Sequence, residues 1–399
     1  MTVMQRQAPA RREMSRSAKA ALPHHVAKAA DDTNARGTVL VRLGLLEDAL
    51  ESYQAAIIRK PDHAGAYCNR ALVNLMLGRF TEGWKDYLWR AGVDRRRAPR
   101  PRAPLPADLS GRGIVIHCEQ GLGDELYFLR FARVLKARGA WLAYGPDPRL
   151  ASMLSRVPFL DEIVAPGVTP SEADMAVALG DLPYLSGATP SEAPPLELRP
   201  EAARLERLGA RLAALGPPPY VGLTWRAGVR SEGKLYKQVE LDRLGPALGG
   251  LDATFIALLR APDESEFDRL VRAIGRPAPS ESERLAGILG RPVHDLSSLN
   301  NELEDMLALL HLLDDYVSVS NTNVHLRAGT GRSSCVLVPH PPEFRWMTEG
   351  HMSPWFPDHP IFRQSRDEDW SSALSHLARE LGGRSPAAAR KARPPRETR

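Results

Sequence analysis

The stretch His117–Ala140, HCEQGLGDELYFLRFARVLKARGA, places two glycines and an acidic pair between a short apolar segment and a long amphipathic one. The residues 113–119 (GIVIHCE) predict a buried strand, and the residues 125–140 predict a helix. The side chains expected to face a sheet from this helix are Leu126, Leu129, Phe131, Val134 and Leu135. The stretch therefore predicts the strand, turn and helix unit of an α/β domain.

The turn itself carries the first candidate site. Gly121 and Gly123 stand where the backbone turns sharply and can approach a ligand, and Asp124 stands at the expected helix start. The loop lacks the Lys-Ser/Thr pair of a P-loop and the GxGxxG fingerprint. Two interpretations of Asp124 stay open: a helix N-cap, or a general base.

Further strand and helix patterns on both sides extend this unit. The segments AWLAYGP, EIVAP and DMAVALGDL predict more strands of the same domain, over about 111–215. After the Pro-rich GPPPY, the segments YVGLTW, ATFIALL, PVHDLS and CVLVPHP begin a second series, over about 216–383. We expect two successive doubly wound, Rossmann-like domains with a ligand-binding cleft between them.

An internal repeat precedes these domains. The segments LGLLEDALESY (Leu43–Tyr53) and LGRFTEGWKDY (Leu77–Tyr87) align at an offset of 34 residues. That is the tetratricopeptide period, in which a glycine ends one helix and a small residue lets two helices approach closely. The pattern predicts tetratricopeptide-like helices over about 36–93, with a plain helical bundle as the alternative.

The net charge of +5 lies mainly outside these regions. Residues 94–110 predict a Pro/Arg-rich linker, and residues 1–35 and 384–399 predict a disordered basic N-terminus and a disordered basic tail. Because no aromatic residues interleave with the basic ones, we expect no nucleic-acid partner. An accessory contact with an acidic surface is the alternative role of the basic segments.

Composition limits the class of protein. The chain has 399 residues, 43% of them hydrophobic, so it can bury a sizeable core. It has no apolar run long enough to span a membrane and no signal-peptide pattern, so we expect a cytoplasmic location. Cys68, Cys118 and Cys335 are widely spaced and predict buried thiols rather than disulfides or a zinc site.

Four stretches in order carry a resemblance that covers about residues 36–381: LGRFTEGWKDYLWR, CEQGLGDELYFLRFARVLKARGA, YVGLTWRAG and YVSVSNTNVHLRAG, the last followed by VLVPHPPEFRW and SPWFP. The chain resembles bacterial tetratricopeptide proteins whose C-terminal half is similar to the ADP-heptose heptosyltransferases, glycosyltransferases of the GT-B fold. The resemblance implies that Asp124 is the catalytic base, with Gly121 and Gly123 beside the substrate.

The resemblance also implies that the second domain binds the donor. Asn321, Thr322 and Asn323 are expected at a helix N-terminus, whose amides and dipole suit a diphosphate. His325, on the first turn, either reaches a phosphate or packs. The family usually has an aspartate where this chain has Asn321, which removes a negative charge beside the donor phosphates.

A cation is expected before the next helix of that domain. In the heptosyltransferases a basic residue there contacts the donor phosphate, and Lys237 matches it best, with Lys234 second. Arg226 and Arg230 are weaker candidates. No DxD or clustered His/Cys pattern indicates a metal, and we expect no cofactor. The segment around Arg345 is expected to pack across the domain joint, with direct ligand binding as the alternative.

These observations predict a glycosyltransferase that moves a sugar from a nucleotide-sugar donor to a protein or glycan acceptor. The resemblance implies an inverting, metal-independent reaction. The repeats would recruit the acceptor or a protein partner. Two alternatives stay open: a noncatalytic tetratricopeptide scaffold with a degenerate glycosyltransferase fold, and a nucleotide-sugar epimerase.

Overall fold

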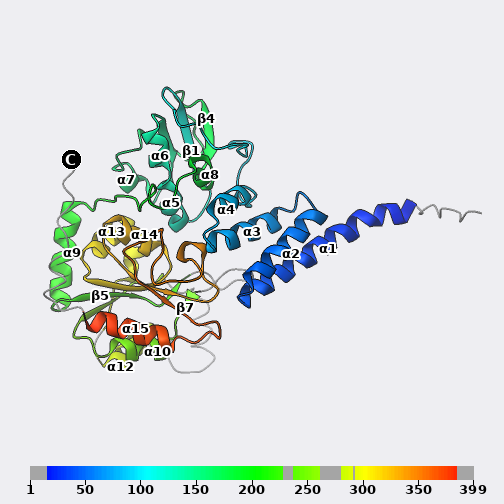
Figure 1. The fold of residues 1–399 in the computed structure, drawn as a ribbon. Helices are drawn as coiled ribbons and strands as arrows, with labels where there is room; N and C mark the ends of the chain where they lie inside the picture. The colour runs from blue at the N-terminus through cyan, green and yellow to red at the C-terminus, as the bar shows by residue number, and fades with distance from the viewer. Residues whose placement is uncertain (1–15, 228–236, 261–279, 291–292, 384–399) are drawn as a thin grey trace, which may run out of the picture.

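A computed structural model describes residues 16–227, 237–260, 280–290 and 293–383. Its N-terminal part is a row of four helices, called here the helical array (residues 16–90): α1 (Arg16–Arg42), α2 (Leu46–Arg59), α3 (Ala64–Met76) and α4 (Phe80–Tyr87). Each helix packs on the next, and the array extends to one side of the molecule (Figure 1). Gly44 and Gly78, at equivalent positions of the two predicted repeats, have φ of 73° and 77°. The predicted helical region is confirmed, whereas its assignment to the tetratricopeptide class stays a prediction.

The helix α1 begins well before residue 36, so residues 16–35 are helical where we expected disorder. Tertiary contact explains the difference. Ala30 is fully buried, and Asn69 of α3 donates a hydrogen bond to the Asn34 side chain at 3.0 Å. The residues 30–34 of α1 thereby gain the tertiary packing from which most protein helices derive their stability.

The next region contains a four-stranded parallel sheet with the order β3-β2-β1-β4. Its elements, from residue 113 to residue 186, are β1 (Gly113–His117), α5 (Leu122–Leu129), α6 (Ala132–Ala137), β2 (Trp141–Gly145), α7 (Ala151–Leu154), β3 (Glu162–Ile163), β4 (Met175–Ala178), η1 (Leu179–Asp181) and α8 (Leu182–Ser186). The predicted strands are confirmed. The single helix predicted over 125–140 is instead two, separated by a turn in which the Phe131 amide donates to the Phe128 carbonyl at 3.1 Å.

The last region contains a six-stranded parallel sheet with the order β12-β11-β10-β5-β8-β9. Its strands are β5 (Tyr220–Thr224), β8 (Thr254–Ala257), β9 (Val293–Asp295), β10 (Asp315–Val319), β11 (Cys335–Val338) and β12 (Ile361–Arg363). A small antiparallel pair, β6 (Arg226–Ala227) and β7 (Lys237–Gln238), lies beside it. The predicted pair of parallel α/β sheets is therefore confirmed.

Helices cover both faces of this second sheet. The helices of this region are α9 (Ala202–Leu215), α10 (Leu241–Leu248), α12 (Glu281–Leu289), η2 (Ser297–Asn301), α13 (Leu303–Leu312), α14 (Thr322–Gly329), η3 (Phe344–Trp346) and α15 (Ser371–Gly382). Figure 1 shows α13 and α14 on one face and α10, α12 and α15 on the other. Strand residues alternate between the two faces, because Tyr316 joins the core under α13 and Val317 joins the core under α15.

The helix α9 packs on α13, so it lies with the second sheet rather than with the first domain, where we expected residues up to 215. Two arginines of α9 reach the same carboxylate on α13. Arg204 pairs with Asp305, and the Arg207 guanidinium lies 2.6 Å from the same oxygen. The ion pairs and the burial of Leu208 and Leu212 fix this helix on the second sheet.

Residues 94–110 are not a solvated linker. Leu109 is 2% exposed, and its amide donates to the Arg138 carbonyl at 2.7 Å. The Leu105 amide donates to the Leu185 carbonyl at 2.8 Å. A basic side chain of this segment also packs on the array, since the Arg100 guanidinium lies 3.8 Å from the centre of the Trp89 ring. The segment is therefore a packed part of the first α/β region.

One apolar core joins the three regions at Trp84 of α4, which is 4% exposed. The centre of its ring lies 6.1 Å from that of Phe128 in α5, 5.7 Å from that of Phe344 in η3 and 6.0 Å from that of Trp355. The array thus contacts both α/β regions.

Candidate functional site

The glycine turn after β1 lies at the carboxyl end of a buried strand. Gly121 is the N-cap of α5, with φ of −76° and ψ of 162° and no side-chain cap. Asp124 lies inside the first turn of the helix, so the N-cap interpretation of Asp124 is wrong. Its side chain is 35% exposed and projects from α5 close to the second domain.

Arg345 of η3 meets this carboxylate from the second α/β region. Its Nη2 pairs with Asp124 Oδ1, and its side chain is 8% exposed. The guanidinium carbon lies 4.6 Å from the centre of the Tyr127 ring and 4.7 Å from that of Phe344. Burial opposes the charge of Arg345, but Asp124 and Glu343 outweigh it, so the pKa of the guanidinium is raised.

Lys237 is joined to the same cluster through Glu343. Lys237 Nζ lies 3.0 Å from Glu343 Oε1, and Arg345 Nη1 lies 4.0 Å from the same oxygen. Burial raises the pKa of Glu343, but the charges of Lys237 and Arg345 and a hydrogen bond from Ser320 outweigh it, so the pKa is lowered overall. The expected base and the expected phosphate-binding lysine are therefore linked by alternating charges, called here the charged row (Asp124, Arg345, Glu343 and Lys237).

The N-terminus of α14 lies directly against the glycine turn. A methyl group added at Gly123 would lie 3.5 Å from Thr322 Oγ1 and 3.4 Å from the His325 ring. Among the described residues, no hydrogen bond is made by the Thr322 hydroxyl or by the amides of Thr322 and Asn323. These donors and the positive end of the helix dipole can bind an anion.

Asn321 acts inside its own domain. Its Oδ1 accepts a hydrogen bond from the Val324 amide at 3.2 Å, which makes it the N-cap of α14. Its Nδ2 donates to Ser318 Oγ at 3.0 Å. An aspartate could accept the same cap bond, so the departure from the family pattern changes charge without removing the cap.

Asn323 and His325 lie deeper. Asn323 is 4% exposed and donates to Asn300 at 3.2 Å. His325 is 6% exposed, with its ring centre 5.3 Å from that of Phe356. Burial and the charges of Arg345 and Arg130 keep the pKa of His325 well below its usual value, so the ring is neutral at pH 7.

The weaker candidates divide into two groups. Arg226 Nε lies 3.0 Å from Glu281 Oε1, so this guanidinium is held by a carboxylate rather than free in solvent. Lys234 and Arg230 lie outside the described residues.

Three residues near the site were not predicted. Glu343 forms an ion pair with Lys237, the expected phosphate-binding cation. Glu119 and Gln120 connect the glycine turn to the helical array. Glu119 and Gln120 directly precede Gly121 in the sequence, and this position beside the predicted turn could have identified them as site residues. Glu343 gave no such signal, because it lies more than a hundred residues from Lys237 along the chain.

The thiols differ from one another. Cys335 is buried as predicted, whereas Cys68 and Cys118 are partly exposed, and none of these three thiols forms a disulfide. Burial and the neighbouring Glu125 carboxyl raise the pKa of Cys118 to about 12, so it stays a thiol.

Across residues 16–227, 237–260, 280–290 and 293–383, no group of three His, Cys, Asp or Glu side chains could hold a metal ion. None of the helices in these ranges is long and apolar enough to cross a membrane.

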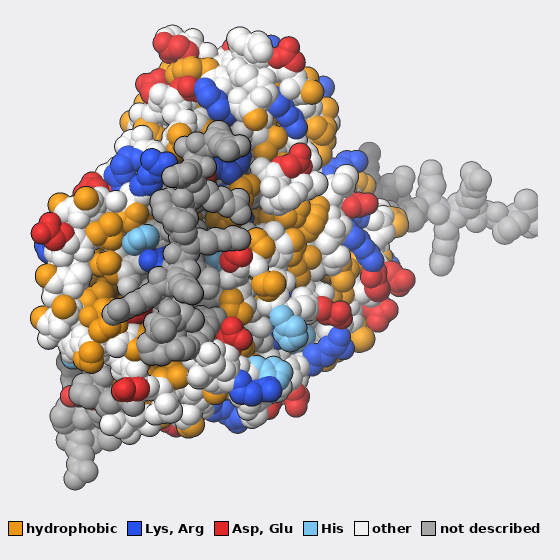
Figure 2. Space-filling view, turned by 60° about the vertical axis from the view of Figure 1, so that its left-hand side comes forward, with side chains coloured by type: hydrophobic (Ala, Val, Ile, Leu, Met, Phe, Trp, Pro, Cys, Tyr) orange, Lys and Arg blue, Asp and Glu red, His pale blue; other side chains and the backbone are white. Residues whose placement is uncertain are grey.

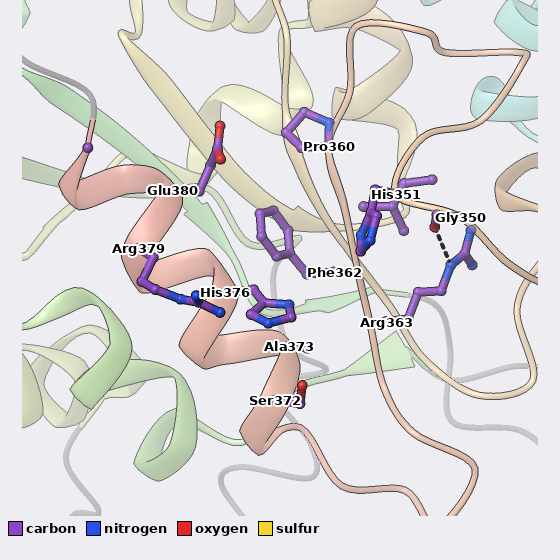
Figure 3. Close-up of a pocket in the computed structure, with 12 residues that line it drawn as sticks. Gly350, His351, Pro360, Phe362, Arg363, Ser372, Ala373, His376, Arg379 and Glu380 are labelled. Carbon is purple, nitrogen blue, oxygen red and sulfur yellow. Dashed lines mark hydrogen bonds between the residues drawn. The ribbon is translucent and has the colours of Figure 1, made fainter.

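Two surface pockets lie away from this site. One, of about 760 Å³, is lined by the loop before β12 and by α15 (Figure 3). Its Arg363 Nε donates to the Gly350 carbonyl at 2.8 Å, so that cation is already used. The other, of about 710 Å³, lies in the helical array. Neither is lined by a residue of the charged row.

The surface in Figure 2 carries acidic and basic side chains interspersed with apolar ones.

Comparison with known proteins gives one curated relative and several solved structures. No protein-family model matches the chain. Protein FlbA of Caulobacter vibrioides is 28% identical over 369 residues, which cover 85% of this chain and 59% of FlbA. The chain therefore spans less than two thirds of the length of that relative.

Two solved structures are similar over most of their own length. A glycosyl transferase family 9 protein from Veillonella parvula is 11% identical and has a TM-score of 0.46, covering 65% of this chain and 88% of its own. The ADP-heptose LPS heptosyltransferase II of E. coli is 12% identical, also with a TM-score of 0.46, covering 68% of this chain and 98% of its own.

Proposed function

We propose that this protein transfers a sugar from a nucleotide-sugar donor to a protein or glycan acceptor, where the glycine turn meets the N-terminus of α14. The observation that carries the proposal is the contact of these two elements, which places Gly123, the neighbour of Asp124, against Thr322 at the start of α14, whose hydroxyl bonds to no described residue. The sequence motifs in the order typical of the heptosyltransferases support it, as does the cation Lys237 in the same cluster.

The donor diphosphate would bind at the start of α14. The amides of Thr322 and Asn323, the Thr322 hydroxyl and Lys237 would hold its negative charge, which increases as the bond to the sugar breaks. Lys237 must then exchange Glu343 for a phosphate oxygen.

Asp124 would act as the base. It would take the proton of an acceptor hydroxyl, whose oxygen bonds to the anomeric carbon as the bond from that carbon to the phosphate oxygen breaks. The electron pair of the broken bond leaves with the nucleoside diphosphate, and attack from the opposite side inverts the anomeric carbon. Arg345 occupies Asp124 Oδ1, so Oδ2 is the oxygen that meets the acceptor.

The first experiment identifies a donor. Thermal-shift measurements on the full chain with nucleoside diphosphates and nucleotide sugars, ADP-heptose among them, should find a stabilising compound. A ligand at 100 times its Kd stabilises by about 2.7 kcal/mol.

The second experiment tests the base. Asp124→Asn should lower turnover of that donor by about 100-fold to 10,000-fold and leave diphosphate affinity unchanged, because the amide keeps the shape but accepts a proton poorly. Asp174→Asn is the matched control, since Asp174 also pairs with an arginine, Arg112 at 3.2 Å. Near-normal turnover of the Asp124 variant would overturn the assignment.

A noncatalytic binding protein is the second candidate. The observation that favours it is that Asp124 and Lys237 are both already paired within the chain. Donor binding without turnover in the wild-type protein would select this candidate. Donor conversion without any acceptor would instead indicate an epimerase.

A further inference from the structure

A buried ion-pair network joins the helical array to the glycine turn. Arg90, at the end of the array, has a side chain that is 5% exposed. Its Nη1 lies 2.6 Å from Asp181 Oδ1, and its Nε donates to Glu119 Oε1 at 3.1 Å. Asp181 is fully buried and Glu119 is 6% exposed, so one guanidinium holds two buried carboxylates.

The network reaches the turn through consecutive residues. Glu119 and Gln120 immediately precede Gly121, the N-cap of α5. Glu119 Oε1 also accepts the Gly180 amide at 2.7 Å. The Tyr87 hydroxyl, at the end of α4, donates to Gln120 Oε1 at 3.2 Å. Both residues before the turn are therefore held by side chains of the helical array.

The network requires arginine at position 90 because of the charge and the shape of the guanidinium. Two buried carboxylates need more than one positive charge, and Arg95 supplies the second by binding Asp181 with Nη1 and Nη2. Arg90 bridges Asp181 and Glu119, because a guanidinium carries several donors in a fixed plane. A lysine at position 90 would keep the charge and lose this bridge.

The packing around the network leaves little room for the turn to shift. A methyl group at Gly180 would lie 2.8 Å from both the Arg90 guanidinium and Gln120 Nε2. Tyr87 itself is 7% exposed, and its ring stacks on Phe128 of α5 with centres 5.6 Å apart. The array, η1 and the turn are thus in contact at one place.

We propose that Arg90 and Tyr87 are positioning residues of the transfer site: they hold Glu119 and Gln120, which set the position of the turn that carries Asp124. The helical array is then part of the transfer machinery as well as a surface for recruiting an acceptor. This inference rests on the proposed role of Asp124. A displacement of a reacting group by about 1 Å can cost about 100-fold in rate, which is the effect such residues prevent.

The first test compares Arg90→Lys with Arg95→Lys in the full chain. Both variants keep the charge near Asp181, but only the first removes the link to Glu119. Amide hydrogen exchange should become at least tenfold faster at residues 120–124 in Arg90→Lys alone. Turnover of the nucleotide sugar found by thermal shift should fall by about 10-fold to 100-fold, with ADP affinity changed by less than twofold.

The second test uses a smaller change, because Arg90→Lys can also weaken folding. Tyr87→Phe removes only the hydroxyl that binds Gln120, and Tyr53→Phe removes a hydroxyl that binds Thr38 within the array. Tyr87→Phe should lower turnover by about twofold to tenfold and accelerate exchange at residue 120, whereas Tyr53→Phe should change neither.

The outcomes separate the inference from the function on which it rests. Unchanged exchange at residues 120–124 in both Arg90→Lys and Tyr87→Phe overturns the positioning role, whatever the activity. Faster exchange with unchanged turnover also overturns it, since the turn would then not need to be held. A wild-type protein that turns over no donor contradicts the proposed function instead, and the exchange measurement still reports on the contact.

Discussion

The ion pairs of the charged row determine which contacts an incoming ligand must replace. Lys237 already lies 3.0 Å from Glu343, and Arg345 already contacts Asp124. A diphosphate must therefore compete with Glu343 for the lysine, while the Thr322 hydroxyl, which bonds to no described residue, is immediately available. The two donors should contribute to affinity by different amounts.

Lys237→Ala and Thr322→Ala test the expected diphosphate site. Each should weaken ADP binding, because hydrogen bonds to charged groups contribute about 1.5–3 kcal/mol. The lysine variant should lose less binding free energy than this range, because in the wild type Lys237 must give up its ion pair with Glu343 to bind the phosphate. Titration calorimetry measures both affinities. Arg243→Ala, which removes an exposed cation of the same domain, is the control. Unchanged affinity in both site variants would place the diphosphate elsewhere.

Glu343 should make stability depend on pH. Its pKa in the folded protein lies below the ordinary value of 4.5. The carboxylate therefore contributes stability that is present above pH 4.5 and is lost as the pH falls through its folded pKa. Glu343→Gln should lose about 1.5–3 kcal/mol at pH 7, and this difference from the wild type should shrink below pH 4.5.

Urea unfolding at a series of pH values measures that difference. Glu47→Gln is the control, because Glu47 is 65% exposed in its pair with Arg79, and exposed pairs contribute about 0–1 kcal/mol. A difference between wild type and Glu343→Gln that stays constant with pH would contradict the assignment of this linkage.

At the scale of elements, two helix N-termini from different domains meet. The amino end of α5 carries the turn, and the amino end of α14 carries Thr322, whose hydroxyl bonds to no described residue. Their dipoles both favour negative charge in the space near the turn. The array helix α4 also packs on α5, because Tyr87 and Trp84 both contact Phe128.

Trp84→Ala should therefore destabilise the whole molecule. Truncating a buried tryptophan costs about 3–5 kcal/mol, and Trp84 contacts α5 and η3 as well as its own array. Trp89→Ala is the control, since Trp89 is only partly buried and stacks on Tyr67 within the array. Equal losses in denaturant unfolding would mean that Trp84 does not join the regions.

At the scale of the whole molecule, the array and the α/β regions form one core. A chain starting at Ala107 would lose the array and with it the cover over Phe128 and Phe344. It would also leave Asp181 and Glu119 buried without their arginines. We expect this truncation to aggregate, because large exposed apolar surfaces associate.

Expression and size-exclusion chromatography of the truncated chain test that expectation. A truncation from residue 37, which removes most of α1 and leaves α2 to α4, is the matched control and should stay soluble. A soluble, monomeric truncation at Ala107 would show that the array is a separate unit.

The sequence by itself determined the local features of this protein. Short apolar runs predicted the strands, and the glycines at 121 and 123 predicted the turn, because these features depend on neighbours in the chain. The local pattern missed the helix at residues 16–35, the packed segment 94–110 and the placement of α9, because all three depend on tertiary contacts. Only the tertiary structure decided that Arg345 pairs with Asp124 and that Arg90 holds Glu119, because these pairs join residues far apart in the chain, and burial in a common core selects such partners.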